Sequence, residues 1–197
     1  MIKATDGIHT VEVGYDSCPE NPREYYEPVG TMVCWHRRYA LGDKHTFDSP
    51  QDFQEEEMKK AFVVLPLFLY DHSGLAMSTS SFVGRAVHAE WDSGQVGYIY
   101  IPEDKVQEKT GFEPTEDNKA HIQKLLEDEV RLYNKYLQGD VYSFSIKDSD
   151  GDWIAGGHSY YSDSIEDAVD EMKECCWEYE SLFEKLQAQF RKTCVAE

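Results

Sequence analysis

Apolar side chains recur at alternating spacings of four and three residues near the end of the chain, and this stripe is its clearest periodic feature. It consists of Ile165, Val169, Met172, Cys176, Tyr179, Phe183, Leu186 and Phe190. The stripe follows Ser164, which forms the pattern of an N-terminal capping box with Asp167. We therefore expect one long amphipathic helix over about residues 164–192, with its apolar face buried against a sheet or another helix.

A second long helix is expected between Thr115 and Gly139. Thr115 is a suitable N-cap, apolar residues follow it at helical spacing, and Gly139 is the usual left-handed terminator. A shorter helix should begin after Ser49, because a serine followed by Pro50 is typical of a first helical turn. It should run to about Lys60.

Alternating or continuous apolar segments predict the β-strands. These segments are Ile8–Tyr15, Val29–Trp35, Phe62–Tyr70, Leu75–Ser80, Gln95–Ile101, Asp140–Lys147 and Asp152–Ala155. Between the last two, Asp148–Gly151 ends in Asp-Gly, which is a strong hairpin signal. With 197 residues, 41% of them hydrophobic, the chain carries enough apolar mass for one core. We predict a single α+β domain over residues 1–197, in which a mainly antiparallel sheet, made of a meander and a hairpin, is packed by two long helices and one or two short ones.

The charge balance excludes several classes of function. Thirty-eight acidic and nineteen basic residues give a formal net charge of −19, so direct nucleic-acid binding is not expected. No apolar run approaches the roughly 20 residues of a membrane helix, and the start of the chain has neither a signal-peptide nor a transit-peptide pattern. The five cysteines lack Cys-x-x-Cys spacing, which favours reduced thiols. We expect a cytoplasmic protein without a membrane partner.

Two predicted turns, Asp71–Gly74 and Trp91–Gln95, carry a Ser-Gly pair together with hydrogen-bonding side chains. If both turns meet at one rim of the sheet, near His36, they would form a pocket for a small ligand. The candidate ligand-binding residues are Asp71, His72, Ser73, Trp91, Asp92, Ser93, Gln95 and His36. The alternative is two unrelated turns whose polar groups hold the backbone. Catalytic residues stay unassigned, because adjacent residues of one turn rarely converge on a common atom.

No metal ion or cofactor is predicted. The seven histidines include no pair at the i, i+4 spacing of a zinc-binding helix. Asp148–Asp152 resembles the start of a calcium loop, but the twelfth position is Ser159 where a glutamate is required. We interpret this segment as a turn.

Carboxylates crowd the polar faces of both long predicted helices. The candidate partner-binding residues are Glu171, Glu174, Glu178, Glu127 and Asp128. Such faces either imitate the phosphate spacing of a nucleic acid and capture a basic protein, or form a solvated surface that keeps the protein soluble. A solvated surface is the usual meaning of a charge run, but the large imbalance also favours the mimic.

Three segments, Gly30–Asp43, Leu65–Gly74 and Trp91–Tyr100, together resemble an uncharacterised family of small proteins carried by bacteriophages and integrative mobile elements. The second segment contains the motif LYDHSG and the third reads WDSGQVGYIY. The similarity extends through Leu137–Tyr142 and thins in the last predicted helix.

The resemblance implies an anti-defence role in the cytoplasm of a bacterial host. Our first hypothesis is an acidic protein that inhibits a host defence component of the anti-CRISPR or anti-restriction type, for example as a nucleic-acid mimic. Its partner would be a host protein with a basic nucleic-acid-binding surface, and it would act as a monomer or homodimer. The alternative is a small enzyme or sequestering protein for a nucleotide-like ligand at the two turns, with Asp71 or His72 as general base and Trp91 stacked on the ligand. A structural phage protein is a third interpretation.

Overall fold

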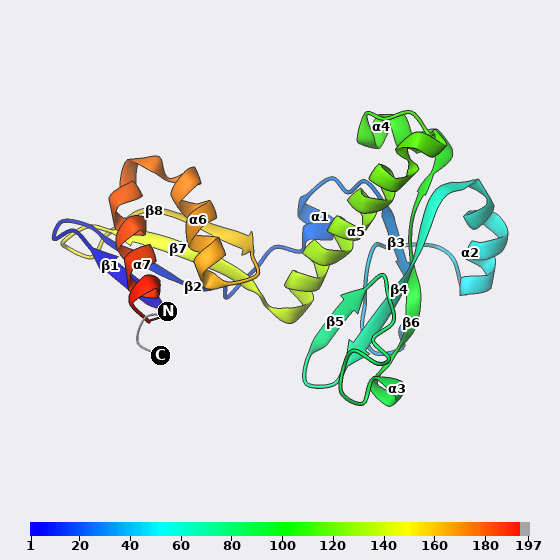
Figure 1. The fold of residues 1–197 in the computed structure, drawn as a ribbon, viewed down its shortest axis with the longest axis horizontal. Coiled ribbons are helices and arrows are strands. Elements are labelled where there is room, and N and C mark those ends of the chain that lie inside the picture. The colour runs from blue at the N-terminus through cyan, green and yellow to red at the C-terminus, as the bar shows by residue number, and fades with distance from the viewer. Residues whose placement is uncertain (194–197) are drawn as a thin grey trace. The chain divides into compact units, whose positions relative to one another are not determined.

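The computed structural model describes residues 1–193 and contains two compact units. The terminal unit combines Met1–Glu20 with the chain from Gly139 onward, and the central unit is Asn21–Gln138. Each unit has a four-stranded antiparallel sheet with helices packed on it (Figure 1). The predicted α+β class and antiparallel pairing are therefore confirmed. We expected one sheet and one core in a single domain, whereas each unit has its own sheet and hydrophobic cluster.

This division follows from strand pairing across a long insertion. β2 (Thr10–Tyr15) pairs with β7 (Val141–Lys147), so that Tyr15 lies opposite Tyr142. The central unit is therefore inserted between two neighbouring strands of the terminal sheet. No long low-complexity linker marks either junction, so composition and periodicity gave no indication of it.

The terminal sheet has the strand order β1-β2-β7-β8. β1 spans Ile2–Thr5 and β8 spans Trp153–Tyr161. Asp148 closes the predicted hairpin between β7 and β8, because its carboxylate accepts the backbone N–H groups of Asp150 and Asp152. β8 continues well beyond its predicted end, through a register shift opposite β7.

The C-terminal stripe is buried as predicted, but the single long helix was wrong. Val169, Met172, Phe183 and Leu186 are fully buried, and the other four members pack against the same cluster. α6 (Ile165–Cys175) ends at Cys176, which has φ −125° and ψ 52°; the 3-10 turn η3 (Trp177–Tyr179) and α7 (Glu180–Thr193) follow. A continuous helix over this segment would be roughly 43 Å long, whereas a nine-residue strand spans roughly 30 Å. The break lets both helices lie on the sheet.

The central sheet has the strand order β3-β6-β4-β5, and the long helix α5 packs on it. The strands are β3 (Thr31–Cys34), β4 (Ala61–Asp71), β5 (Leu75–Ser78) and β6 (Ser93–Pro102). The helices are α1 (Pro22–Tyr25), α2 (Pro50–Glu56), η1 (Met58–Lys60), α3 (Ala89–Asp92), η2 (Glu103–Lys105), α4 (Val106–Thr110) and α5 (Glu116–Gln138).

The predicted start of α2 and the predicted end of α5 are confirmed, whereas α2 ends at Glu56 and the residues up to Lys60 form the separate turn η1. Ser49 accepts the N–H of Asp52 at the start of α2, and Gly139 has φ +77° at the end of α5. One face of α5 is buried against the main hydrophobic cluster of the central sheet. The buried residues on this face are Ile122, Leu126, Val130 and Tyr133. A separate cluster is centred on Phe53 of α2, with Val33 and Tyr100 of the sheet. The sheet is therefore packed by α5 and by α2 through different sets of side chains.

A buried arginine ties the start of the central unit to α5. Arg23 is only 8% exposed, and its guanidinium binds both oxygens of Asp43 at 2.9 and 2.6 Å, Glu129 at 3.1 Å and the carbonyl of Gly30 at 2.7 Å. Glu129 also accepts the N–H groups of Val29 and Gly30. Burial lowers the pKa of Arg23, but the hydrogen bond and charge of Asp43, with Glu129, outweigh this and raise it. Glu129 thus has a structural role inside a predicted acidic face.

Candidate functional site

The two segments predicted as Ser-Gly turns meet at one end of the central sheet, although Trp91–Gln95 is the end of α3 and the start of β6 and not a turn. β4 ends and β6 begins there, because Tyr70 pairs with Ser93 and Leu69 pairs with Gly94. An open depression of about 290 Å³ lies at this end of the paired strands. It is lined by His36, Arg38, Leu69, Asp71, Trp91, Asp92, Ser93, Gly94 and Val96.

Strand alternation separates the side chains of the first turn. Asp71 lines the depression and is bound by the guanidinium of Arg38 and, at 3.4 Å, by the hydroxyl of Tyr39. His36 stacks on Tyr39 with ring centroids 5.0 Å apart, and its Nδ1 accepts the backbone N–H groups of Arg38 and Tyr39. The segment after β3 thus supports Asp71 from one side.

His72 is not among the residues that line the depression, although it touches one that does. Its Nδ1 lies 2.7 Å from Oδ2 of Asp92, and its ring lies 5.9 Å from the rings of Tyr70 and His88. His88 adopts φ +56°, a conformation that non-glycine residues seldom take. We expected Asp71, His72, Trp91 and Asp92 to cluster at one end of the sheet: three of them line the depression, and His72 contacts it through Asp92.

The remaining predicted residues have less direct positions. Ser93 lines the depression, but its hydroxyl donates to the carbonyl of Ala89, the first residue of α3. Gln95 donates from its side-chain amide to the carbonyl of Gly97. Ser73 is exposed and lies outside the lining. Asp71, His72 and Ser73 therefore form no catalytic triad.

Cysteine chemistry is also disfavoured at this end of the sheet. Burial raises the pKa of the Cys34 thiol to about 12, with a smaller contribution from the charge of Asp43. The reactive thiolate is therefore scarce near neutral pH. Cys18, Cys34, Cys175 and Cys176 are all free.

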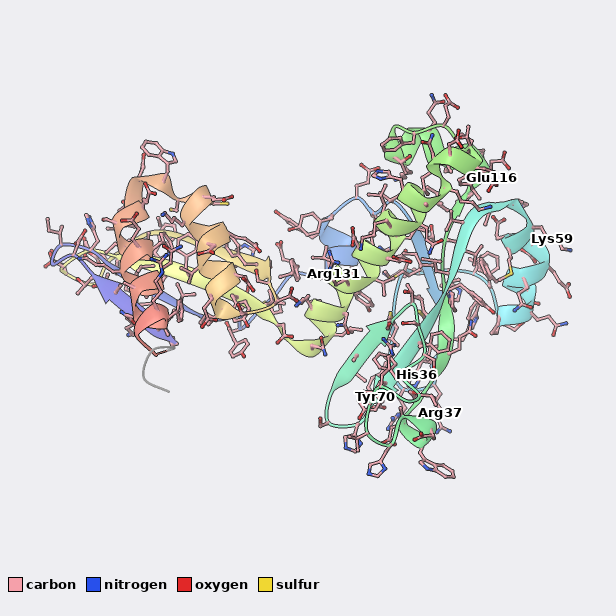
Figure 2. The ribbon with its side chains drawn as sticks, in the orientation of Figure 1. His36, Arg37, Lys59, Tyr70, Glu116 and Arg131 are labelled. Atoms are coloured by element: carbon pink, nitrogen blue, oxygen red, sulfur yellow. The ribbon has the colours of Figure 1, made fainter. Side chains whose placement is uncertain are left out.

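Sequence reasoning missed Arg38, Tyr39 and His88. The available signal was the consecutive basic run from His36 to Arg38, placed just after a predicted strand. Figure 2 shows His36, Arg37 and Tyr70 at one end of the central unit and Lys59 well away from them. Long-range partners such as Asp71 for Arg38, 33 positions away, carry no sequence pattern of their own.

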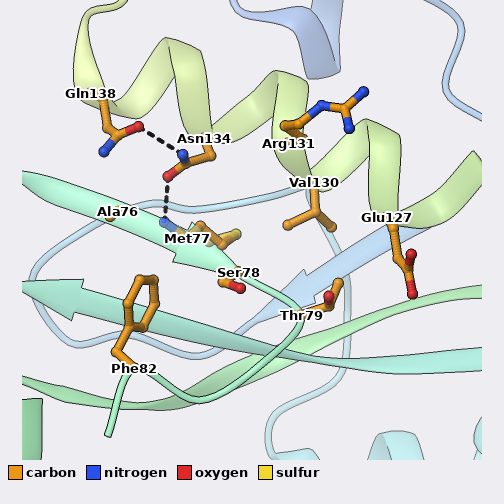
Figure 3. A pocket seen from close by; sticks show the side chains of 10 residues that line it. All are labelled: Ala76, Met77, Ser78, Thr79, Phe82, Glu127, Val130, Arg131, Asn134 and Gln138. Atoms are coloured by element: carbon orange, nitrogen blue, oxygen red, sulfur yellow. Dashed lines mark hydrogen bonds between the residues drawn. The ribbon is translucent and has the colours of Figure 1, made fainter. Parts of the chain in front are cut away.

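A second depression, of about 350 Å³, lies between β5 and α5 (Figure 3). Asn134 spans it, because its Oδ1 accepts the N–H of Met77 at 2.7 Å and its Nδ2 donates to Gln138 at 2.7 Å. Met77 belongs to an edge strand, whose free N–H groups are ordinarily a hazard for unwanted pairing. We therefore assign Asn134 a structural role. Glu127, from the predicted partner surface, lines this depression and accepts from Gln123.

The predicted acidic faces differ in how far their charges are neutralised. Asp128 pairs with both Lys124 and Arg131. On the terminal unit, Glu171 accepts from the hydroxyl of Ser162 at 2.8 Å, while Glu174 and Glu178 are exposed.

Charge is concentrated in the terminal unit. In the sequence this unit carries eighteen acidic and six basic residues, a net charge of −12 out of −19. Trp177, in η3, is 73% exposed between Glu174 and Glu178 in the chain.

Within the described residues, no group of three or more His, Cys, Asp or Glu side chains is placed to hold a metal ion. Among residues 1–193, none of the helices is both long and apolar enough to traverse a bilayer. Comparison with protein-family models, curated proteins and solved structures found no match to this chain.

Proposed function

We propose that this protein is an anti-defence binding protein that docks its acidic helices on the basic nucleic-acid-binding surface of a host defence component. The concentration of negative charge in the terminal unit is the observation that carries the proposal. The resemblance to proteins of phages and mobile elements supplies the setting, an anti-CRISPR or anti-restriction role in the bacterial cytoplasm. The protein acts as a monomer or homodimer.

The α6–η3–α7 surface combines the two contributions that such an interface needs. Complementary charge speeds association and sets orientation, while a buried aromatic anchor supplies much of the affinity. Glu174 and Glu178 provide charge, and Trp177 provides the anchor. On α5, the pairing of Asp128 with two cations makes that helix the weaker candidate.

Replacing Glu174 and Glu178 together with lysine should slow association with the partner about tenfold or more at low salt, and change dissociation less. The partner is first captured from host lysate on the unmodified protein, and the two rates are then measured by surface plasmon resonance at several salt concentrations. Glu55 and Glu56 of α2, both exposed, are reversed to lysine as the control with the same charge change. Equal effects of both double variants would show that only overall charge matters, and an unchanged rate for the first would refute the docking surface.

The depression at the end of the central sheet favours a second function, the binding or conversion of a small nucleotide-like ligand. Its support is the convergence of both turns on one cavity with an exposed indole, Trp91. Sequestration is better supported than catalysis, because Asp71 is held by Arg38 and Tyr39 and is therefore not a free base.

A further inference from the structure

We infer that the depression at the end of the central sheet binds a ligand that joins a phosphate group to a planar ring, of which a nucleoside monophosphate is the simplest form. The inference rests on the second function proposed above and names the chemical class of its ligand. It does not depend on the acidic surface of the terminal unit.

Hydrogen-bond donors without a partner outnumber free acceptors around the depression. Arg38 uses only Nη2, for Asp71, which leaves its Nε and Nη1 donors without a partner within the described residues. The Nδ1 of His36 accepts two backbone N–H groups, so a neutral ring carries its proton on Nε2. The principal free acceptor is Oδ1 of Asp92. A ligand that satisfies these donors must bring acceptors, and phosphate oxygens match a guanidinium well.

The local charge supports the same conclusion. His36, Arg37 and Arg38 are consecutive in a chain that is otherwise strongly acidic. Arg37 is exposed and has no ion pair among residues 1–193, while the charge of Asp71 is balanced by Arg38. A phosphate in the depression therefore meets the guanidinium of Arg38 and the ring of His36, which both line it, while Arg37 adds positive charge from the neighbouring position in the chain.

The opposite wall provides the site for a ring. Trp91 lines the depression, is 88% exposed and makes no ring contact with another residue of the described chain. Leu69 and Val96 add apolar lining. Bases stack on exposed aromatic side chains with little dependence on their identity.

The size of the depression suits a small ligand with one ring and one phosphate group. At about 290 Å³ it lies near the lower end of the roughly 300–1,000 Å³ that small-molecule pockets occupy. A polynucleotide would bring many more phosphates near a protein with net charge −19, which is unfavourable.

The test measures binding to the full chain by isothermal titration calorimetry and by NMR. The probes are adenosine and guanosine monophosphate, the two nucleosides and inorganic phosphate. We expect the monophosphates to bind at least tenfold more tightly than either nucleoside or phosphate alone, because only they use both walls. Trp91→Ala and Arg38→Gln should each weaken monophosphate binding about tenfold, while Lys59→Gln, an exposed cation at another place on the unit, should have no effect.

Asp71→Asn separates direct contact from indirect support. It releases Arg38 from its carboxylate partner, so a guanidinium that contacts the ligand should bind the monophosphate equally well or more tightly. Equal weakening by Asp71→Asn and Arg38→Gln would overturn the inference. Equal binding of nucleosides and monophosphates would also overturn it but would leave ligand binding itself intact. Absence of binding by every probe, with an unchanged circular dichroism spectrum, would reject both this inference and the second function proposed above.

Discussion

Replacing Phe183 with alanine should lower the free energy of unfolding of the terminal unit by about 3–5 kcal/mol. Phe183 is fully buried on α7, and its ring meets that of Phe144 edge-on with centroids 5.4 Å apart. Truncation removes this contact and leaves a cavity between the helix and the sheet, which the neighbours can fill only in part.

Chemical denaturation followed by circular dichroism gives the overall change, and hydrogen exchange in peptides from β7 and α7 assigns it to the terminal unit. Trp177→Ala is the matched control, because its side chain is exposed and its loss should change stability little. An unchanged midpoint for the Phe183 variant would mean that α7 is free to meet a second subunit. Light scattering over a range of concentrations would then test for a dimer.

Replacing Arg23 with methionine should destabilise the central unit by about 3–5 kcal/mol. The variant leaves the carboxylates of Asp43 and Glu129 close together without the guanidinium that binds both of them. The apolar side chain of methionine does not offset the loss of these charged hydrogen bonds. Denaturation of the same kind, with hydrogen exchange in peptides from β3 and α5, measures the effect.

Neutralising the two carboxylates in the same variant, by Asp43→Asn and Glu129→Gln, should recover part of the lost stability. The amide oxygen at position 43 can still accept the backbone N–H of Met32. The single amide oxygen at position 129 can accept from only one of Val29 and Gly30, which the carboxylate binds through separate oxygens, so the recovery is partial. No recovery would assign the loss to packing around Arg23 instead of to unpaired charge. A loss below about 1 kcal/mol for the single variant would place the network among ordinary surface ion pairs.

Features encoded within a few residues could be predicted from the sequence. Ser49 and Ser164 cap their helices, Gly139 ends α5, and Asp148 closes its hairpin, because each contact joins residues no more than four positions apart or depends on one residue's conformation. The apolar stripe was correctly predicted to be buried. Its interruption at Cys176 was not predicted, because α6 and α7 keep the same spacing across the break.

Features that depend on distant pairing could not be predicted. Arg23 and Glu129 are 106 positions apart, and no local pattern distinguishes that glutamate from the exposed carboxylates beside it. At the candidate site, the two turns were identified from composition, but the faces of their side chains follow from the register of β4 with β6. That register places Asp71 in the depression and His72 outside it.

The insertion of the central unit between β2 and β7 has a consequence for synthesis on the ribosome. The backbone N–H of Asp16 donates to the carbonyl of Val141 at 2.8 Å. This contact can form only after all of Asn21–Gln138, which lies between the two residues in the chain, has been synthesised. At roughly 5–20 residues per second, translation of that segment takes on the order of 6–24 s. During this time β2 is paired at most with β1 and lacks its second partner, β7. The central unit can fold in this interval, whereas the acidic helices α6 and α7 are synthesised after it. The surface proposed to capture a partner therefore forms only after the whole central unit has been made.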